Sequence, residues 1–306
     1  MTSAEKIREI TRKHLAEGGV ALGQCLTAVG WVGGTVPELT EADGLIELSI
    51  ADVSNGGEAV GLALAGRRPI YIVRYQGFLW YNAAMIVNYA AKSKAVWGVP
   101  CPIFLRAIGM IGSGPVTGGS QHSLLTRMPG IAVCAPMTPG EYEKAWDYFM
   151  AHDDPVCVSE HRFAWPIDYE MPDSINERAD ITLLAISATR LNAIVAQKTL
   201  AADGITCNVI HLFWLKPFVL TDIIKKAVCS SKYGGIVLDG DFEGGVVKTI
   251  AFDIAQGTGV RMEVLALEER TAGYAPQLDN VPPTPEKICA YVRQLIKTAD
   301  SDKVKP

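Results

Sequence analysis

The sequence has no hydrophobic run long enough to cross a membrane, because no stretch reaches the roughly 18 uncharged apolar residues that a span requires. The apolar core of a secretion signal is missing too, since residues 1–14 (MTSAEKIREITRKH) carry charges at helical spacing. We therefore expect a cytoplasmic protein without a membrane partner.

Cysteine spacings typical of metal or redox sites are also absent. The chain has no CxxC pair and no Cys/His ligand spacing, so no structural metal site is expected. At 306 residues it can bury a large core, and its fold needs neither disulfides nor a metal. We expect reduced, mostly buried thiols at the seven cysteines, which lie singly at positions 25, 101, 134, 157, 207, 229 and 289.

The common nucleotide-binding and hydrolase signatures are missing as well. There is no Walker loop, no GxGxxG after a strand, no HExxH and no GxSxG. The formal net charge of −5 disfavours a cationic nucleic-acid-binding protein, so no nucleic-acid partner is expected.

Apolar strand patterns alternate with helical patterns almost from end to end of the chain. Such alternation is typical of a parallel sheet covered by helices on both faces. It stops over residues 164–179, where two prolines, four acidic residues and no sustained period indicate a linker. The predicted fold class is therefore α/β, with a larger domain over residues 1–165, a linker over 166–179 and a smaller domain over 180–306.

The stretch between positions 45 and 92 holds the first candidate site residue. We expect a strand over Leu45–Ile50, a glycine-rich turn over Ser54–Gly57 and a helix after it, then a long helix over 78–92. Asp52 then follows the end of a strand, where α/β proteins have the crevice in which they bind ligands. A simple turn-forming role also accounts for this residue.

A histidine and a group of aromatic residues are further candidates. His122 lies in the polar, glycine-rich loop Thr117–Ser123, where a ligand contact and a structural role are both plausible. Aromatic rings crowd the segment from 75 to 89, as core, interface or ligand platform. The residues alone thus indicate a crevice with a carboxylate, a histidine and aromatic rings.

Several spaced motifs resemble those of thiamine-diphosphate enzymes. The sequence is similar to the beta subunits of 2-oxo acid dehydrogenase decarboxylating components and to the C-terminal half of transketolases, and the resemblance covers nearly the whole chain. The motifs that carry it are Ile50–Asp52, Ala59–Gly61, Ala65–Ile70, Phe78, Asn88, Ala90–Lys92, Arg106, Gly109, Gln121–Ser123, Pro129–Ile131, Pro136–Pro139, Asp154–Val156, Glu160–His161, Arg270, Tyr274–Leu278 and Pro283–Ile288.

The resemblance implies a pyrimidine-binding domain followed by a transketolase C-terminal-like domain. It also implies roles for residues at matching positions. Asp52 stands where the family has the glutamate that activates the cofactor's pyrimidine ring, Phe78 and Tyr81 belong to the cofactor site, and His122 matches the active-site histidine. Arg74 and Arg106 become candidate substrate ligands, above all if the substrate carries a phosphate.

The chain departs from this family at two places. Asp52 is shorter than the usual glutamate by one carbon–carbon bond, roughly 1.5 Å. The early Gly23–Cys25 stretch lacks the acidic pair of the dehydrogenase relatives, which leaves the usual substrate in doubt.

No Gly-Asp-Gly…Asn motif is present to hold magnesium and the diphosphate. The resemblance then implies an alpha-type partner subunit that carries this motif and holds the magnesium. The expected assembly is a heterotetramer, a dimer of heterodimers.

Three functions follow from the resemblance. The first is the pyrimidine-side subunit of a two-chain enzyme that decarboxylates a 2-oxo acid and transfers the acyl or aldehyde unit. The second is the C-terminal subunit of a split transketolase that moves a ketol unit between sugar phosphates. The third is a non-catalytic structural paralogue.

Overall fold

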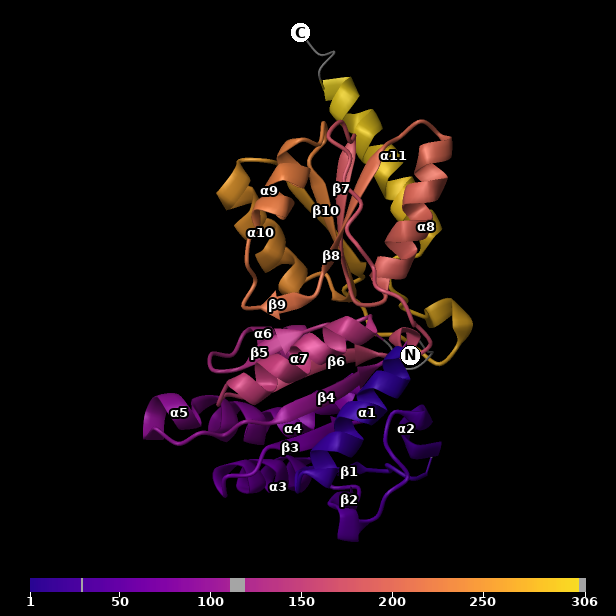
Figure 1. The fold of residues 1–306 in the computed structure, drawn as a ribbon. Helices are drawn as coiled ribbons and strands as arrows, with labels where there is room; N and C mark the ends of the chain where they lie inside the picture. Colours follow the sequence, from indigo (N-terminus) through magenta and orange to yellow (C-terminus); the bar gives the residue numbers. More distant parts are fainter. Residues whose placement is uncertain (29, 111–118, 303–306) are drawn as a thin grey trace. The chain divides into compact units, whose positions relative to one another are not determined.

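The computed structural model describes residues 1–28, 30–110 and 119–302, and the chain divides into two compact units (Figure 1). Unit 1 comprises Met1–Glu170, Phe213–Pro217 and Ala272–Leu278, and unit 2 comprises Met171–Leu212, Phe218–Thr271 and Asp279–Pro306. The first division lies within the stretch 166–179 that the sequence marks as a linker. The two short returns of the chain to unit 1 were not expected.

Unit 1 is built on a seven-stranded sheet in the order β2-β1-β3-β4-β6-β5-β9. All neighbours in it are parallel except β9, which is antiparallel to β5. Every residue of β1, β3, β4 and β6 is buried, which explains why most of these strands read as continuous apolar runs. The strands are β1 Val20–Gln24, β2 Leu45–Leu48, β3 Pro69–Val73, β4 Phe104–Gly109, β5 Ala132–Cys134, β6 Val156–His161 and β9 Trp214–Lys216.

Helices and short turns connect these strands. In α1, Thr2 and Glu5 form a reciprocal capping box, and in α7 the Thr138 hydroxyl accepts a hydrogen bond from the amide of Glu141 behind Pro139. The helices of unit 1 are α1 Ser3–Ala16, α2 Gly30–Gly34, α3 Asp52–Leu64, α4 Leu79–Met85, α5 Ala91–Trp97, α6 Ser123–Thr126 and α7 Pro139–Ala151. Short 3₁₀ turns cover Glu41–Asp43, Gln76–Phe78, Arg162–Ala164 and Pro276–Leu278.

Two local expectations for unit 1 are wrong. Helix α3 begins at Asp52, so the expected turn before it is helical. A Cβ at Gly56 would lie 3.1 Å from Asn82 Oδ1 and 3.3 Å from Met85 Cβ, so this glycine permits close packing of α3 against α4. The expected long helix over 78–92 is interrupted by a π-helical turn at Ile86–Ala90, between α4 and α5.

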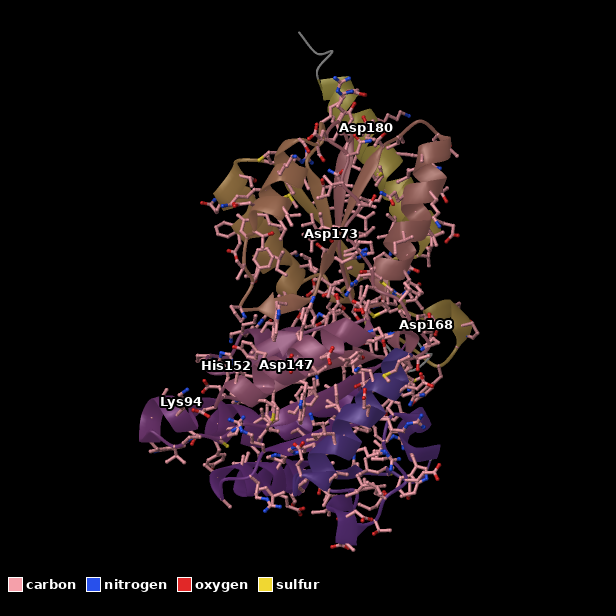
Figure 2. All side chains as sticks on the ribbon, in the orientation of Figure 1. Lys94, Asp147, His152, Asp168, Asp173 and Asp180 are labelled. Atoms are coloured by element: carbon pink, nitrogen blue, oxygen red, sulfur yellow. The ribbon has the colours of Figure 1, made fainter. Side chains whose placement is uncertain are left out.

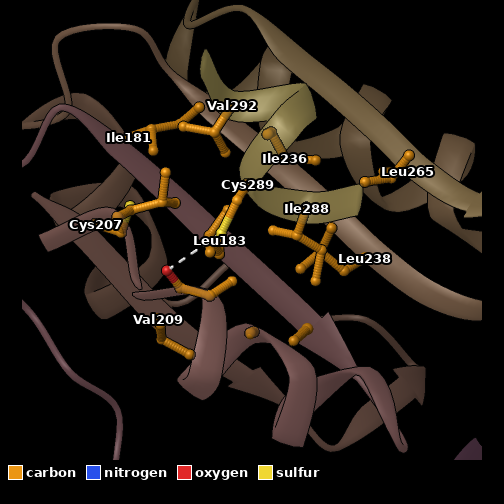
Figure 3. Packing of buried hydrophobic residues seen from close by; sticks show 14 residues of the cluster. Ile181, Leu183, Cys207, Val209, Ile236, Leu238, Leu265, Ile288, Cys289 and Val292 are labelled. Carbon is orange, nitrogen blue, oxygen red and sulfur yellow. Dashed lines mark hydrogen bonds between the residues drawn. The ribbon is translucent and has the colours of Figure 1, made fainter. Parts of the chain in front are cut away.

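Unit 2 contains a parallel four-stranded sheet in the order β11-β10-β7-β8. Its core gathers apolar residues of the strands with residues of α8 and α11, among them Leu183, Leu238 and Ile288 (Figure 3). Its strands are β7 Ile181–Ile186, β8 Cys207–Leu212, β10 Gly235–Phe242 and β11 Met262–Leu267. Its helices are α8 Thr189–Ala202, α9 Asp222–Cys229, α10 Val246–Thr258 and α11 Pro285–Asp302.

Two aspartates labelled in Figure 2 satisfy backbone donors of unit 2. Asp180 accepts from the amide of Thr206 at 2.8 Å, and Asp173 accepts from the amide of His211 at 2.8 Å.

None of the helices in the described part of the chain combines the length and hydropathy needed to cross a bilayer.

Candidate functional site

Asp52 meets two amide groups at the carboxyl edge of the unit 1 sheet. It is the first residue of α3, where the helix N-terminus favours a negative charge. Gln24, the last residue of β1, donates from Nε2 to Asp52 Oδ1 at 3.0 Å. Asn82 in α4 donates from Nδ2 to the same oxygen at 3.2 Å. One carboxylate oxygen is thus held from two different elements.

A buried tyrosine holds Asn82 in turn. The hydroxyl of Tyr71 in β3 donates to Asn82 Oδ1 at 2.5 Å, while Asn82 Nδ2 also donates to the carbonyl of Phe78 at 3.0 Å. Burial raises the pKa of Tyr71, and the negative charges of Asp52 and Glu58 raise it further. The phenol therefore stays protonated and remains a donor at neutral pH.

The second oxygen of Asp52 is the one left for a ligand. None of the described residues donates a hydrogen bond to Asp52 Oδ2, since both donors of this side chain use Oδ1. Asp52 lines an open pocket of about 250 Å³ together with Ala51, Val53, Ser54 and Tyr81. The carboxylate therefore offers a free acceptor to a molecule in this pocket.

Aromatic rings stand beside this pocket. The ring centroids of Phe78 and Tyr81 are 6.4 Å apart at 45°, and those of Tyr75 and Phe78 are 5.7 Å apart at 85°. Tyr81 is 57% exposed, whereas Phe78 is half-buried and does not line the pocket. The structure thus brings Asp52 and Tyr81 together and places Phe78 next to Tyr81.

Two energetically unfavourable features lie beside Asp52 at the end of β1. Gln24 Oε1 is buried and has no hydrogen-bond partner among the described residues, which costs about 1–3 kcal/mol for an unsatisfied polar group. Cys25 has φ +55°, a left-handed conformation worth about 1–3 kcal/mol of strain in a residue other than glycine. Such costs cluster at functional sites.

Arg74 reaches the same strand end. Its Nη1 donates to the carbonyl of Cys25 at 3.3 Å, and its guanidinium lies 5.7 Å from the ring centroid of Tyr75. Within the described part of the chain, Arg74 Nε is buried without an acceptor. This half-buried arginine therefore keeps one buried donor unused beside Cys25, the residue that follows β1.

His122 belongs to a buried network. Its Nδ1 lies 2.9 Å from Ser159 Oγ, which accepts from Gln76 Nε2 at 2.8 Å. Gln76 Oε1 in turn accepts from the amide of Gln121 at 2.7 Å. The side chain of His122 is fully buried, and Thr117 and Gly118 of its loop lie outside the described residues. Gln76 connects this network to the 3₁₀ turn that carries Phe78.

Arg106 has structural partners. It is 1% exposed and makes two 2.9 Å hydrogen bonds to the carboxylate of Glu160, which is itself fully buried. Its Nη2 also donates to Thr35 Oγ1 at 2.8 Å, and Trp165 Nε1 donates to Glu160 at 2.7 Å. This geometry argues against the expected role of Arg106 as a substrate ligand and favours a buried ion pair in the core of unit 1.

Three residues of this site were missed from the sequence, namely Gln24, Tyr71 and Asn82. Gln24 is a polar residue at the end of an apolar run, and Asn82 is a buried amide within an aromatic segment. Either feature is a signal for a functional polar residue. The hydrogen bonds to Asp52, however, join residues that are 28 and 30 positions apart in the sequence, which no local pattern reveals.

Two domain families match the chain. Residues 27–166 match "Transketolase, pyrimidine binding domain", and residues 173–288 match "Transketolase, C-terminal domain".

Individual relatives align over most of the chain. The beta subunit of the pyruvate dehydrogenase E1 component of Rickettsia bellii is 30% identical over 226 residues, 68% of this chain and 68% of the relative. The 2-oxoisovalerate dehydrogenase subunit beta of Bacillus subtilis is 27% identical over 282 residues, 82% of this chain and 83% of the relative. The chain spans 59% of the acetoin:2,6-dichlorophenolindophenol oxidoreductase subunit beta of Cupriavidus necator, at 26% identity over 201 residues, 60% of this chain.

Two solved structures share the fold. A split-gene transketolase, described as an inactive beta4 tetramer, has a TM-score of 0.73 at 17% identity and covers 97% of this chain and 99% of its own. A transketolase from Campylobacter jejuni has a TM-score of 0.73 at 15% identity, over 96% of this chain and 46% of its own.

Proposed function

Because the chain belongs to the family that joins transketolase pyrimidine-binding and C-terminal domains, with pyruvate dehydrogenase E1 beta subunits among its relatives, we propose that it is the pyrimidine-side subunit of a two-chain, thiamine-diphosphate-dependent enzyme. The proposed reaction is decarboxylation of a 2-oxo acid with transfer of the acyl or aldehyde unit. The dehydrogenase beta subunits among the relatives favour this reaction over ketol transfer.

The observation that carries the proposal is the free oxygen of Asp52 in an open pocket beside an exposed tyrosine. An aminopyrimidine ring fits this lining, because a ring nitrogen can share a proton with Asp52 Oδ2 while Tyr81, with Phe78 beside it, contacts the ring. When bound, thiamine diphosphate supplies the electron sink for cleaving the bond next to a carbonyl group. The chain's residues then hold and orient the ring and fix its protonation.

We assign substrate binding to Arg74, whereas the fully buried His122 acts on the site through its hydrogen-bond network. The guanidinium of the half-buried Arg74 suits the carboxylate of a 2-oxo acid. The imidazole of His122 lies on Ser159 and is linked through Gln76 to the turn before Phe78, so its ring has a fixed orientation. A phosphate-bearing substrate is less well served, because Arg106 is 1% exposed and held by the buried Glu160.

The proposal includes an alpha-type partner in a heterotetramer in the cytoplasm. Within the described residues no group of three or more His, Cys, Asp or Glu side chains is arranged to hold a metal ion, which supports placing magnesium and the diphosphate on the partner. Large apolar side chains also face solvent along α4, the π turn and α5, as expected for a protein-binding surface. They are Trp80, Tyr81, Tyr89, Val96 and Trp97, each 48–62% exposed.

The test is reconstitution with a candidate alpha-type chain that carries a Gly-Asp-Gly…Asn motif. Decarboxylation of pyruvate and of branched 2-oxo acids is compared with ketol transfer from ketose phosphates, and cofactor binding is followed by calorimetry. Turnover of a 2-oxo acid supports the proposal. Ketol transfer alone identifies a split transketolase, and a complex without cofactor binding or turnover identifies a structural paralogue.

A further inference from the structure

Gln24 lies beside Asp52 in this site and donates a hydrogen bond to it. We infer that Gln24, together with Asn82, clamps one oxygen of Asp52 so that the other oxygen points at the bound ring, and that Gln24 is a positioning residue specific to this short acid. The inference rests on the proposed function for the identity of the ring, but the clamp itself is a property of the chain without ligand.

The geometry of the two donors defines the clamp. Gln24 and Asn82 donate to the same oxygen, Oδ1, over 3.0 and 3.2 Å, one from the end of β1 and the other from α4. Both side chains are more than nine-tenths buried, at 6% and 0% exposure. Two donors from separate rigid elements restrict both side-chain torsions of Asp52, and hence the direction of Oδ2.

The orientation of the Gln24 amide is set by Asp52. Turned over, the amide would place its carbonyl against a carboxylate oxygen, so Nε2 is the atom that faces Asp52. In this orientation Oε1 stays buried with no partner in the described part of the chain. The next residue, Cys25, has φ +55°. The chain therefore accepts two unfavourable local features to keep this donor on the carboxylate.

A neutral side chain at position 24 is required by the distance to Asp52. An acid at this position would bring two carboxylates to about 3 Å, and repulsion would force a proton onto one of them. Glutamine removes this conflict and adds a donor. A glutamate at position 52 would carry its carboxylate about 1.5 Å farther along its side chain, beyond the position at which both amides meet Oδ1. The shorter acid and the glutamine thus fit together.

The first experiment needs no ligand. In the isolated chain, side-chain amide signals of Gln24 and Asn82 are assigned by NMR in wild type and in Asp52→Ala. We expect slowed hydrogen exchange of one Gln24 N–H in wild type and its loss in the variant, because the acceptor is gone. Unchanged exchange would overturn the clamp whatever the enzyme does.

The second experiment is a double-mutant cycle in the reconstituted complex. Gln24→Met keeps the length of the side chain and removes the donor, and we expect the dissociation constant for thiamine diphosphate to rise about 10-fold. In an Asp52→Ala background the same change should have little further effect, because Gln24 acts through Asp52. Equal effects in both backgrounds would contradict the inference.

Two variants complete the set. Gln24→Glu preserves size but makes two carboxylates share one proton, which changes the charge on Asp52, so we expect it to weaken cofactor binding at least as much as Gln24→Met. Gln197→Met is the matched control, because Gln197 lies in unit 2 and donates to Ser174 Oγ and to the carbonyl of Cys207. Cofactor binding by Gln24→Glu at wild-type strength would overturn the clamp. If wild-type complex binds no cofactor, the proposed function fails while the NMR experiment still decides the clamp.

Discussion

The hydroxyl of Tyr71 donates to Asn82 Oδ1 at 2.5 Å, and Asn82 donates in turn to Asp52 Oδ1 at 3.2 Å. A core residue of β3 thereby fixes the amide that holds the candidate catalytic acid. The orientation of Asp52 is consequently tied to the folding of the sheet rather than to a surface loop.

Replacing Tyr71 by Phe tests this link. Asn82 Oδ1 would lose its donor in a fully buried position, so we expect the free energy of unfolding to fall by about 1–3 kcal/mol. Urea denaturation of the isolated chain measures this loss. Tyr291→Phe is the control, since its hydroxyl makes only a 3.4 Å hydrogen bond to Glu263 in a half-buried position. Equal losses in the two variants would contradict a special role for Tyr71.

The buried pair Arg106–Glu160 predicts a change in stability. Arg106→Met leaves the Glu160 carboxylate fully buried without its cation, and removing one partner of such a pair costs about 3–5 kcal/mol. The double variant Arg106→Met/Glu160→Gln should recover part of this loss. Denaturation curves measure both, and a raised KM with unchanged stability would instead assign Arg106 to substrate binding.

The exposed aromatic surface of unit 1 predicts a partner contact. Trp97 in α5 is 56% exposed, and Trp97→Lys should weaken association with the alpha-type subunit about 10-fold or more while the chain remains folded. Phe252→Lys is the matched control, because this α10 side chain is 62% exposed in unit 2. Analytical ultracentrifugation measures association. Similar weakening by both changes would refute a specific role for the α5 surface.

Acid sensitivity is expected from His161, whose side chain is 2% exposed and accepts from the amide of Phe163. Burial, with a further effect of Arg162, lowers the pKa of His161 to about 4. Below the unfolded pKa near 6.5 the unfolded chain binds a proton that the native chain excludes. Stability is thus full above pH 6.5 and falls between pH 6.5 and 4.

His161→Asn keeps an acceptor and removes the titration. We expect the free energy of unfolding of this variant to change less with pH across this window. Its slope against pH should be smaller than that of the wild type by about 1.4 kcal/mol per pH unit. Unfolding curves between pH 4 and 8 provide the comparison. Parallel profiles for wild type and variant would mean that His161 is protonated in the native state.

Strands buried on both faces are the easiest elements to predict from the sequence. Every residue of β3 and of β7 is buried, and a parallel sheet with two covered faces leaves a nearly unbroken apolar run in such strands. Strand β1 was missed, since Gly23 and Gln24 interrupt its pattern. The family is confirmed by the two domain matches.

The site was predictable only in part. Its residues from one segment, such as Asp52 and Tyr81, follow from local motifs and the resemblance. The start of α3 could not be predicted in this way. A glycine such as Gly56 is typical of turns, but here it permits close packing of α3 against α4. The contacts of Asp52 with Gln24 and Asn82 arise from sheet order and helix packing, which no local pattern contains.

The most direct test of the account is the turnover of 2-oxo acids by the reconstituted complex with Asp52 changed to Ala, Asn or Glu. We expect Asp52→Ala and Asp52→Asn to reduce kcat by about 100-fold or more, because neither side chain shares a proton with the ring. Thermal unfolding and association with the partner should stay near wild type. An Asp52→Ala complex that turns over substrate at the wild-type rate would contradict the central claim that this carboxylate activates the cofactor.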